Sequence, residues 1–165
     1  MHTEAYAGFG RMLQEAGVDR HAPITVLDLG GQNVNGTVHN WFTDAMVTTL
    51  DLENADIIAD ATTWRPDRTW DVVICTEVFE HVRDWRAIVG TAYAALGPGG
   101  VFVFTCASLN RPPHGATGAP LPARGEWYAN VEPGDIQQAL HGAGFQVRHV
   151  DYQWPPGDAY GYGIV

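Results

Sequence analysis

A chain of 165 residues with 45% hydrophobic and 17% charged side chains has a globular composition and can bury one substantial core. Its 19 acidic and 9 basic side chains give a formal net charge of -10, which disfavours nucleic acid as a partner because a negative surface repels phosphates. There is no run of 18 apolar residues and no basic segment followed by an apolar core, so we expect no membrane span, no secretory signal and a cytoplasmic location.

Hydrophobic periodicity predicts strands and helices in alternation along the chain. Apolar residues at helical spacing predict a first helix over residues 5–16, which Gly17 ends. Short apolar runs, typical of strands that a parallel sheet buries on both faces, follow it. They lie at residues 24–29, 46–51, 57–60, 71–76, 101–106 and 145–150, and residues 160–165 could add a last strand. Helices are predicted at 85–96 and 133–144, so we expect an α/β domain with a mostly parallel sheet.

The pattern breaks over residues 107–130, where Pro, Gly, Arg and polar residues replace the apolar runs. Loops this long in compact domains are usually functional or disordered, so we interpret the segment as a substrate-side loop. The chain then reads as one domain over 1–165. Its N-terminal helix lies at 1–22, its ligand-binding core at 24–106, and its closing helix and strands at 131–165.

Acidic residues stand at or just beyond the ends of four successive predicted strands. They are Asp28, Asp51, Asp60 and Glu77. A single acid in such a place is most often a helix cap or a turn residue. Four of them would line the carboxyl edge of the sheet, where open α/β sheets bind their ligands. The sequence therefore predicts a site that accepts hydrogen bonds from hydroxyl and amine groups.

The turn after the first strand contains Gly30 and Gly31. Glycine there allows a positive φ and lets the backbone approach a ligand closely, although tight turns alone also need it. Asp51 follows Asp28 by about 23 residues, the spacing at which a second-strand acid binds ribose hydroxyls. These features favour a nucleoside-containing cofactor.

In this order the motifs resemble the class I S-adenosylmethionine-dependent methyltransferases, in the branch that acts on small molecules. Residues 26–31, VLDLGG, are similar to their first motif, in which an acid precedes the glycine turn. Residues 76–82, TEVFEHV, look like the segment after their fourth strand, and residues 96–100, LGPGG, like the turn before their fifth. The resemblance covers about residues 24–106, which would be the cofactor-binding core, and is weaker to residue 150.

The resemblance implies a three-layer Rossmann-like fold with an antiparallel last strand, and S-adenosyl-L-methionine as the cofactor. The implied cofactor-binding residues are Asp28, Gly30, Gly31, Gln32, Asn33, Asp51, Leu52, Asp60, Ala61, Thr76, Glu77 and Val78. Asp51 would hold the ribose, and Asp60 with Ala61 the adenine. Gln32 stands where the family usually has glycine, so its amide and that of Asn33 either contact the methionine end or mark an altered pocket.

Two rival interpretations share the architecture. A nicotinamide-dependent oxidoreductase is disfavoured because the turn lacks the G-x-G-x-x-G pattern. Asp28 would also place a negative charge near a pyrophosphate, whereas it suits an ammonium and a sulfonium. A non-catalytic cofactor-binding or partner-regulating module is the second rival, because the short chain has no separate cap to bind an acceptor.

The resemblance implies methyl transfer to an O or N atom of a small-molecule acceptor. His81 is the first candidate for a base, with capping or packing in the following helix as its structural alternative. We expect Glu80 to be a solvated or capping acid. In the long loop, four residues would either meet the acceptor or only pack the loop onto the sheet: His114, Trp127, Tyr128 and Asn130.

No spacing of cysteine or histidine resembles a zinc site, so no metal is expected. Cys75 and Cys106 lie in apolar strand-like runs and are expected to be buried, reduced thiols. The sequence leaves open which acceptor is used, and whether a homodimer completes the pocket.

Overall fold

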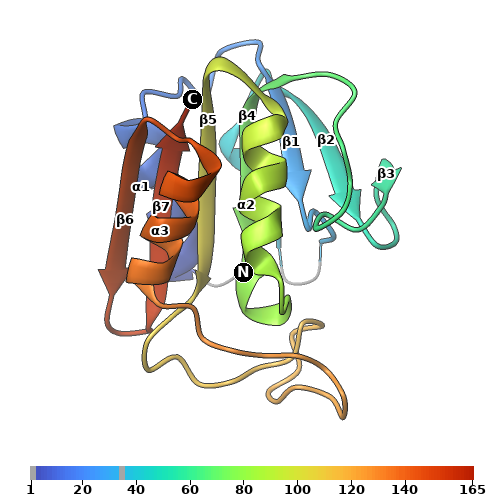
Figure 1. Ribbon diagram of the computed structural model, residues 1–165, viewed down its shortest axis with the longest axis vertical. Helices are drawn as coiled ribbons and strands as arrows, with labels where there is room; N and C mark the ends of the chain where they lie inside the picture. The colour runs from blue at the N-terminus through green and yellow to red at the C-terminus, as the bar shows by residue number, and fades with distance from the viewer. Residues whose placement is uncertain (1–2, 34–35) are drawn as a thin grey trace.

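The structure is a computed structural model that describes residues 3–33 and 36–165. Seven strands form one sheet in the order β3-β2-β1-β4-β5-β7-β6 (Figure 1). Their bounds are β1 Thr25–Leu29, β2 Met46–Asp51, β3 Ile57–Ile58, β4 Trp70–Thr76, β5 Leu96–Ala107, β6 Val147–Gln153 and β7 Asp158–Ile164. β1 to β5 pair in parallel, whereas β7 is antiparallel to both of its neighbours, β5 and β6. The predicted mostly parallel sheet with an antiparallel last strand is confirmed.

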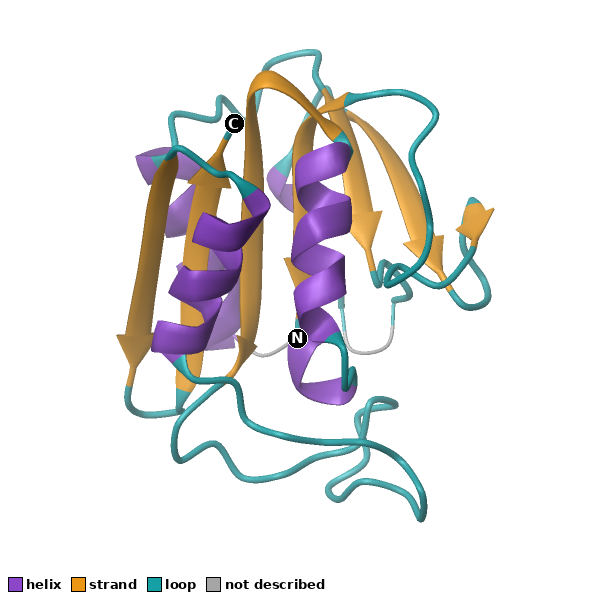
Figure 2. Ribbon diagram, in the orientation of Figure 1, coloured by secondary structure: helices purple, strands orange, loops and turns teal. Residues whose placement is uncertain are grey.

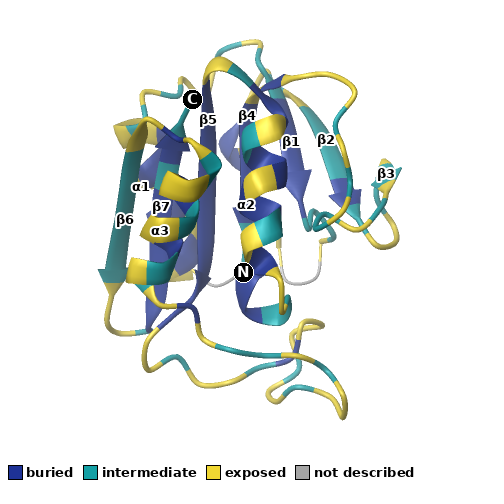
Figure 3. Ribbon diagram, in the orientation of Figure 1, coloured by how far each residue is buried: buried dark blue, intermediate teal, exposed yellow. Residues whose placement is uncertain are grey.

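Helices cover both faces of the sheet and complete three layers (Figure 2). α1 (Thr3–Glu15) packs against β5 and β7 on one face, while α2 (Trp85–Ala94) and α3 (Pro133–Ala143) lie over the other. Alternate residues of β5 serve the two faces, because side chains along a strand point to opposite sides. Val103 joins the cluster around α1, and Phe102 joins the cluster around α2 and α3. The central strands are buried on both faces (Figure 3).

The bounds of α3 follow from its terminal residues. Pro133 stands at the first helical position, where its missing N–H is not needed for the helix. Gly144 caps the other end with a φ of 110°, the left-handed conformation that glycine adopts most easily. Phe145 follows it directly and stacks on Phe102, with 5.9 Å between the ring centroids. This contact anchors α3 to the sheet.

The structure differs from the expected elements in several bounds and in the alternation of strands and helices. β5 begins at Leu96 rather than at residue 101, so α2 ends at Ala94, and the register of β5 against β4 shifts where residues 97–100 enter the strand. β6 begins at Val147 rather than at residue 145, because Phe145 is used for packing before the strand starts. β3 ends at Ile58 and β7 begins at Asp158, where the sequence predicted residues 60 and 160.

Strict alternation of strands and helices is wrong over the first half of the sheet. Among the described residues no α-helix lies between β1, β2, β3 and β4, and only the 3-10 turn His39–Trp41 forms between β1 and β2.

The thiols of Cys75 and Cys106 lie on adjacent strands, are buried and form no disulfide, as predicted. Burial raises the pKa of both thiols well above the usual value, which makes them unreactive. Within the two described ranges, none of the helices combines the length and the apolar character that crossing a membrane requires.

Candidate functional site

A cavity of about 930 Å³ opens at the carboxyl edge of the sheet, beyond the ends of β1, β2 and β4. Its volume is in the range of small-molecule and cofactor sites. Thirteen of the residues singled out from the sequence line it: Asp28, Gly30, Gly31, Gln32, Asp51, Leu52, Asp60, Ala61, Thr76, Glu77, Val78, His81 and His114. The topology therefore brings together residues that are distributed over about 90 positions of the chain.

The turn after β1 has a backbone path that only glycine suits. Gly30 has a φ of 81°, and its N–H donates a hydrogen bond to the carbonyl of Leu50 over 2.8 Å. A Cβ at Gly30 would lie 2.3 Å from Cγ2 of Val78, far inside van der Waals contact. The turn is thus held between β2 and the segment after β4, with its backbone at the cavity wall.

Asp28 is buried with part of its hydrogen-bonding capacity unused. It is 4% exposed, and its Oδ2 lies 2.7 Å from Nε2 of His39. Among the described residues, no hydrogen-bond donor reaches the buried Oδ1. Burial raises the pKa of Asp28, and the hydrogen bond with His39 opposes that rise. A buried carboxylate oxygen of this kind is suited to a donor or a positive charge supplied by a ligand.

Asp51 ties the glycine turn to the end of β2. Its Oδ2 accepts a hydrogen bond from the backbone of Gln32 over 3.1 Å, and its Oδ1 accepts one from Leu52 over 2.6 Å. Each carboxylate oxygen can accept a second bond, so the side chain can also face a ligand. Asn33 has a different place: its Oδ1 accepts from the N–H of Gly36 over 2.9 Å, and it is not among the residues lining the cavity.

Asp60 organises the wall beyond β3. Its Oδ1 accepts hydrogen bonds from the backbone N–H and the hydroxyl of Thr62, over 2.8 and 2.7 Å. This is the ordinary turn-capping use of an aspartate. It also fixes Ala61, which packs against the core cluster and lines the cavity.

The segment after β4 leaves the sheet through a strained residue. Glu77 has a φ of 59°, uncommon for a residue other than glycine and found mostly where a site imposes it. Its N–H donates to the carbonyl of Thr105 over 2.8 Å, and its Oε1 accepts from the hydroxyl of Thr105 over 2.9 Å. β5 therefore holds the strained turn in place.

Glu80 is a correction to the sequence analysis. It is 0% exposed rather than a solvated acid, because β5 and the long loop pack over it. Its Oε1 accepts from the N–H of Ala107 over 3.1 Å, and its Oε2 has no hydrogen-bond partner in the described part of the chain. Burial and the nearby charge of Glu77 raise the pKa of Glu80 well above its usual value. The acid lies beside the cavity rather than in solvent.

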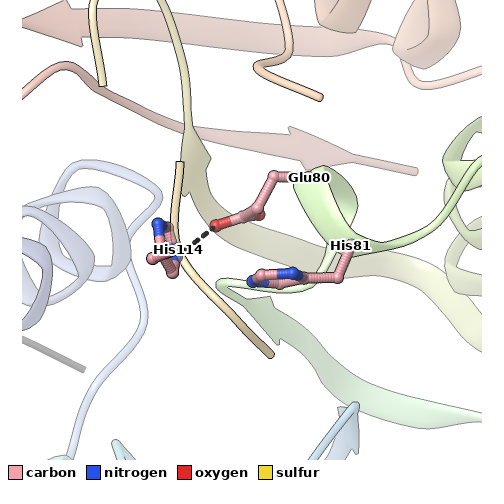
Figure 4. Close-up of side chains that lie close together, drawn as sticks. All are labelled: Glu80, His81 and His114. Carbon is pink, nitrogen blue, oxygen red and sulfur yellow. Dashed lines mark ion pairs between the residues drawn. The ribbon is translucent and has the colours of Figure 1, made fainter. Parts of the chain in front are cut away.

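The long loop folds back over the end of the sheet and brings His114 next to His81 and Glu80 (Figure 4). The rings of His81 and His114 meet edge to face at 5.1 Å, and the ring of Tyr128 contacts both, at 5.4 and 5.1 Å. Burial and the neighbouring His114 lower the pKa of His81 to about 4, so it is neutral at physiological pH. His81 and His114 line one side of the cavity, and Glu80 and Tyr128 lie behind them.

The other residues expected to meet an acceptor do not line the cavity. Trp127 is 39% exposed and stacks under the guanidinium of Arg83, 4.5 Å from the ring centroid. Asn130 donates a hydrogen bond to the carbonyl of Arg111 over 2.9 Å. Arg111, which the sequence analysis did not select, lines the cavity and forms an ion pair with Asp158 at 3.2 Å. Trp127, Tyr128 and Asn130 therefore support the loop rather than face the cavity.

Residues 2–150 match a family model described as a methyltransferase domain. The chain is 36% identical to the ubiquinone biosynthesis O-methyltransferase of Psychrobacter arcticus over 104 aligned residues. The aligned region covers 63% of this chain and 39% of that protein. The protein of the same description from Pseudomonas entomophila is 30% identical over 105 residues, 63% of this chain and 42% of that protein. The matches thus span about two fifths of the length of these relatives.

Solved structures share the fold at low sequence identity. A Burkholderia thailandensis 1,6-didemethyltoxoflavin-N1-methyltransferase, solved with S-adenosylhomocysteine, superposes with a TM-score of 0.67 at 14% identity, over 98% of this chain and 76% of that one. An S-adenosylmethionine-dependent methyltransferase from Mesorhizobium loti gives 0.66 at 18% identity, over 97% and 100%. The Rossmann-like fold expected from the sequence is confirmed.

Proposed function

Since this chain belongs to the methyltransferase domain family, we propose that it is an enzyme that transfers a methyl group from S-adenosylmethionine to an O or N atom of a small molecule. One observation carries the proposal: the carboxylates at the ends of β1 and β2 and the Gly30 turn meet in one cavity of cofactor size. The partner-free, buried Oδ1 of Asp28 fits a ligand that brings its own donor groups and positive charge.

Different residues of the cavity would contact different parts of the cofactor. Asp51 would accept the ribose hydroxyls at the end of β2, and each bond to a charged acceptor is worth roughly 1.5–3 kcal/mol. Asp60 and Ala61 would border the adenine, together with Leu52. The methionine portion would lie along Gly30 and Gly31, with its ammonium toward Asp28.

The remaining wall would enclose the reacting end. Thr76 ends β4, Glu77 and Val78 follow it along the cavity wall, and Gln32 lies next to the glycine turn. We assign Asn33 a structural task, because its side chain is used to cap the turn at Gly36. These assignments make one cavity serve the cofactor on the β1–β3 side and the acceptor on the loop side.

S-adenosylmethionine, held by Asp28, the Gly30 turn and Asp51, would supply an activated sulfonium methyl group. On transfer the sulfur would keep the electron pair of the broken S–CH₃ bond, which leaves the neutral thioether S-adenosylhomocysteine. The chain's own contribution is positioning, which can lower a barrier by about 7–11 kcal/mol. If the acceptor must lose a proton, His81 would be the candidate to accept it, because it lines the cavity and is neutral at pH 7, but its pKa of about 4 makes it a weak base. The loop over residues 107–130 would cover the acceptor.

The proposal is tested by the melting temperature of the chain with and without S-adenosylhomocysteine. A ligand that binds the folded state raises the melting temperature, so we expect a clear shift for the wild type. Asp51→Ala should remove most of that shift. Asp71→Ala is the matched control, since Asp71 lies at the opposite end of the sheet and its variant should keep the shift.

Two outcomes would replace the proposal. No shift with S-adenosylhomocysteine, together with a shift with NAD, would favour an oxidoreductase. Firm binding of S-adenosylmethionine with no methyl transfer to any of a broad set of phenols, acids and amines would favour a non-catalytic module.

A further inference from the structure

Glu80, His81 and His114 form a compact cluster on the loop side of the cavity (Figure 4). One ligand-capable atom from each lies within 4.8 Å of the other two. Glu80 and His81 come from the 3-10 turn Phe79–His81, and His114 comes from the long loop. His114 lies more than thirty residues after Glu80 and His81 in the sequence, so no short motif indicates the cluster.

The carboxylate of Glu80 points into this cluster with unused capacity. The side chain is fully buried, and its Oε1 accepts a hydrogen bond from Ala107. Its Oε2 is buried and has no hydrogen-bond partner within residues 3–33 and 36–165. The oxygen that faces His114 is Oε1, at 3.8 Å, and the same carboxyl group keeps Oε2 without a donor. A buried oxygen without a partner is costly, so a cation bound to this group would relieve a cost already present in the fold.

The imidazole of His114 is held as that of a metal-binding histidine usually is. Nδ1 of His114 lies 3.3 Å from the carbonyl of Pro112, which can only accept, so Nδ1 carries the proton and Nε2 presents a lone pair. That Nε2 lies 3.8 Å from Oε1 of Glu80. Metal-bound histidines typically direct their second nitrogen to a carbonyl or carboxylate in this way. Nδ1 of His81 is different: it is buried, lies 3.8 Å from Oε1 of Glu126 and has no hydrogen-bond partner among the described residues, so its lone pair or proton is unused.

We propose that Glu80, His81 and His114 bind a divalent transition-metal cation, for which zinc is the best match. Two imidazoles and one carboxylate form a known three-ligand set for zinc, with a fourth position left open. Magnesium prefers oxygen ligands and is disfavoured by two nitrogens. Tetrahedral zinc places its ligands about 3.4 Å apart, so the widest pair would have to close by about 1.4 Å.

The cation would change what the cluster does. A zinc ion here would hold the loop against the turn after β4, and its open position would face the cavity. In that state His81 is a ligand, and its coordinating nitrogen is no longer a base. A role in orienting an oxygen of the acceptor rests on the proposed function, whereas binding of the metal itself does not.

Titration calorimetry of the metal-free chain with zinc alone tests the site. Wild type should bind one zinc ion. His114→Ala should bind it at least about tenfold more weakly, and Glu80→Gln should show the same loss if it retains the melting temperature of a folded protein. His141→Ala removes an exposed histidine outside the cluster and should bind as wild type does.

No binding by wild type, equal binding by His114→Ala and His141→Ala, or equal affinity for magnesium and zinc would overturn the proposal. S-adenosylhomocysteine binding by metal-free wild type separates this result from the fate of the proposed function, because none of the three proposed zinc ligands is among the residues assigned to the cofactor. His141→Ala should keep that binding as well, since it lies outside the cavity. If wild type binds S-adenosylhomocysteine but not zinc, the zinc site is overturned and the methyltransferase proposal stands.

Discussion

The two ends of the sheet use their acidic residues in opposite ways. At the amino end, Asp71 of β4 accepts hydrogen bonds from both the backbone N–H and the hydroxyl of Thr25 in β1, each over 2.7 Å. Asp71 is exposed, and these bonds lower its pKa. At the carboxyl end, Asp28 and Glu80 are buried, each has an oxygen without a partner among the described residues, and burial raises the pKa of both.

The acid at the amino end contributes to the stability of the fold, whereas the buried acids at the carboxyl end are suited to binding a ligand. A satisfied acid on the surface supports the fold, because its hydrogen bonds favour the charged form at no cost of burial. A buried acid with a free oxygen costs stability unless something supplies a partner. Proteins keep such groups where a ligand completes them, so the carboxyl end is the end built for binding.

The largest expected effect is that of Gly30→Ala at the carboxyl end. The new Cβ would collide with Val78 and would also be held at a positive φ, which alone costs about 1–3 kcal/mol. We expect a lower melting temperature and loss of S-adenosylhomocysteine binding. Gly17→Ala is the matched control: its φ is 80°, but a Cβ there meets nothing within 4 Å. Equal effects of the two substitutions would mean that the turn after β1 is not closely packed.

A moderate effect on binding without loss of stability is expected for Asp28→Asn. Asparagine removes a buried charge, so the melting temperature should not fall. The affinity for S-adenosylhomocysteine should fall at least about tenfold, or 1.4 kcal/mol, because the ammonium loses its counter-charge. Calorimetric titration and thermal melts measure both quantities. If Asp28→Asn lowered the melting temperature more than Asp71→Ala does, Asp28 would be needed for stability, and the proposed difference between the two ends of the sheet would be wrong.

The smallest effect is that of Asp71→Ala, which should lower the free energy of unfolding by about 1 kcal/mol and leave S-adenosylhomocysteine affinity unchanged. Its lowered pKa fixes the sign of the pH dependence. The contribution is full above the usual aspartate pKa and is lost as the pH falls through the lower, folded-state pKa. Urea melts of wild type and variant should therefore converge in acid. If the difference in the free energy of unfolding between wild type and variant stayed constant down to the lowest pH, the hydrogen bonds of the ionised Asp71 would not be its source.

Much of the carboxyl end follows from local sequence. The run ending at Asp51 has the bounds of β2, and the acids at the strand ends fall on one edge because parallel strands share their direction. The glycine turn also has a local signal, whereas the antiparallel direction of β7 was implied only by the family resemblance. These local signals therefore predict the wall of the cavity that we assign to the cofactor.

The opposite wall depends on contacts that no local pattern encodes. Glu80 looks like a surface acid in its own segment, yet it is buried, with its Oε1 accepting a hydrogen bond from Ala107 and its backbone carbonyl one from Ala129. His39 meets Asp28 through a turn that has no helical or strand periodicity. The path of the long loop, which brings His114 beside His81, is set by tertiary contacts such as that of Tyr128.

The most direct test of the contrast is a calorimetric titration of the wild-type chain with S-adenosylhomocysteine, alongside Asp28→Asn and Asp71→Ala. We expect the wild type to bind one molecule of S-adenosylhomocysteine per chain, Asp28→Asn to bind it more weakly, and Asp71→Ala to bind it as the wild type does. Absence of binding by the wild type, or equal weakening by both variants, would contradict the assignment of the carboxyl end of the sheet to the cofactor.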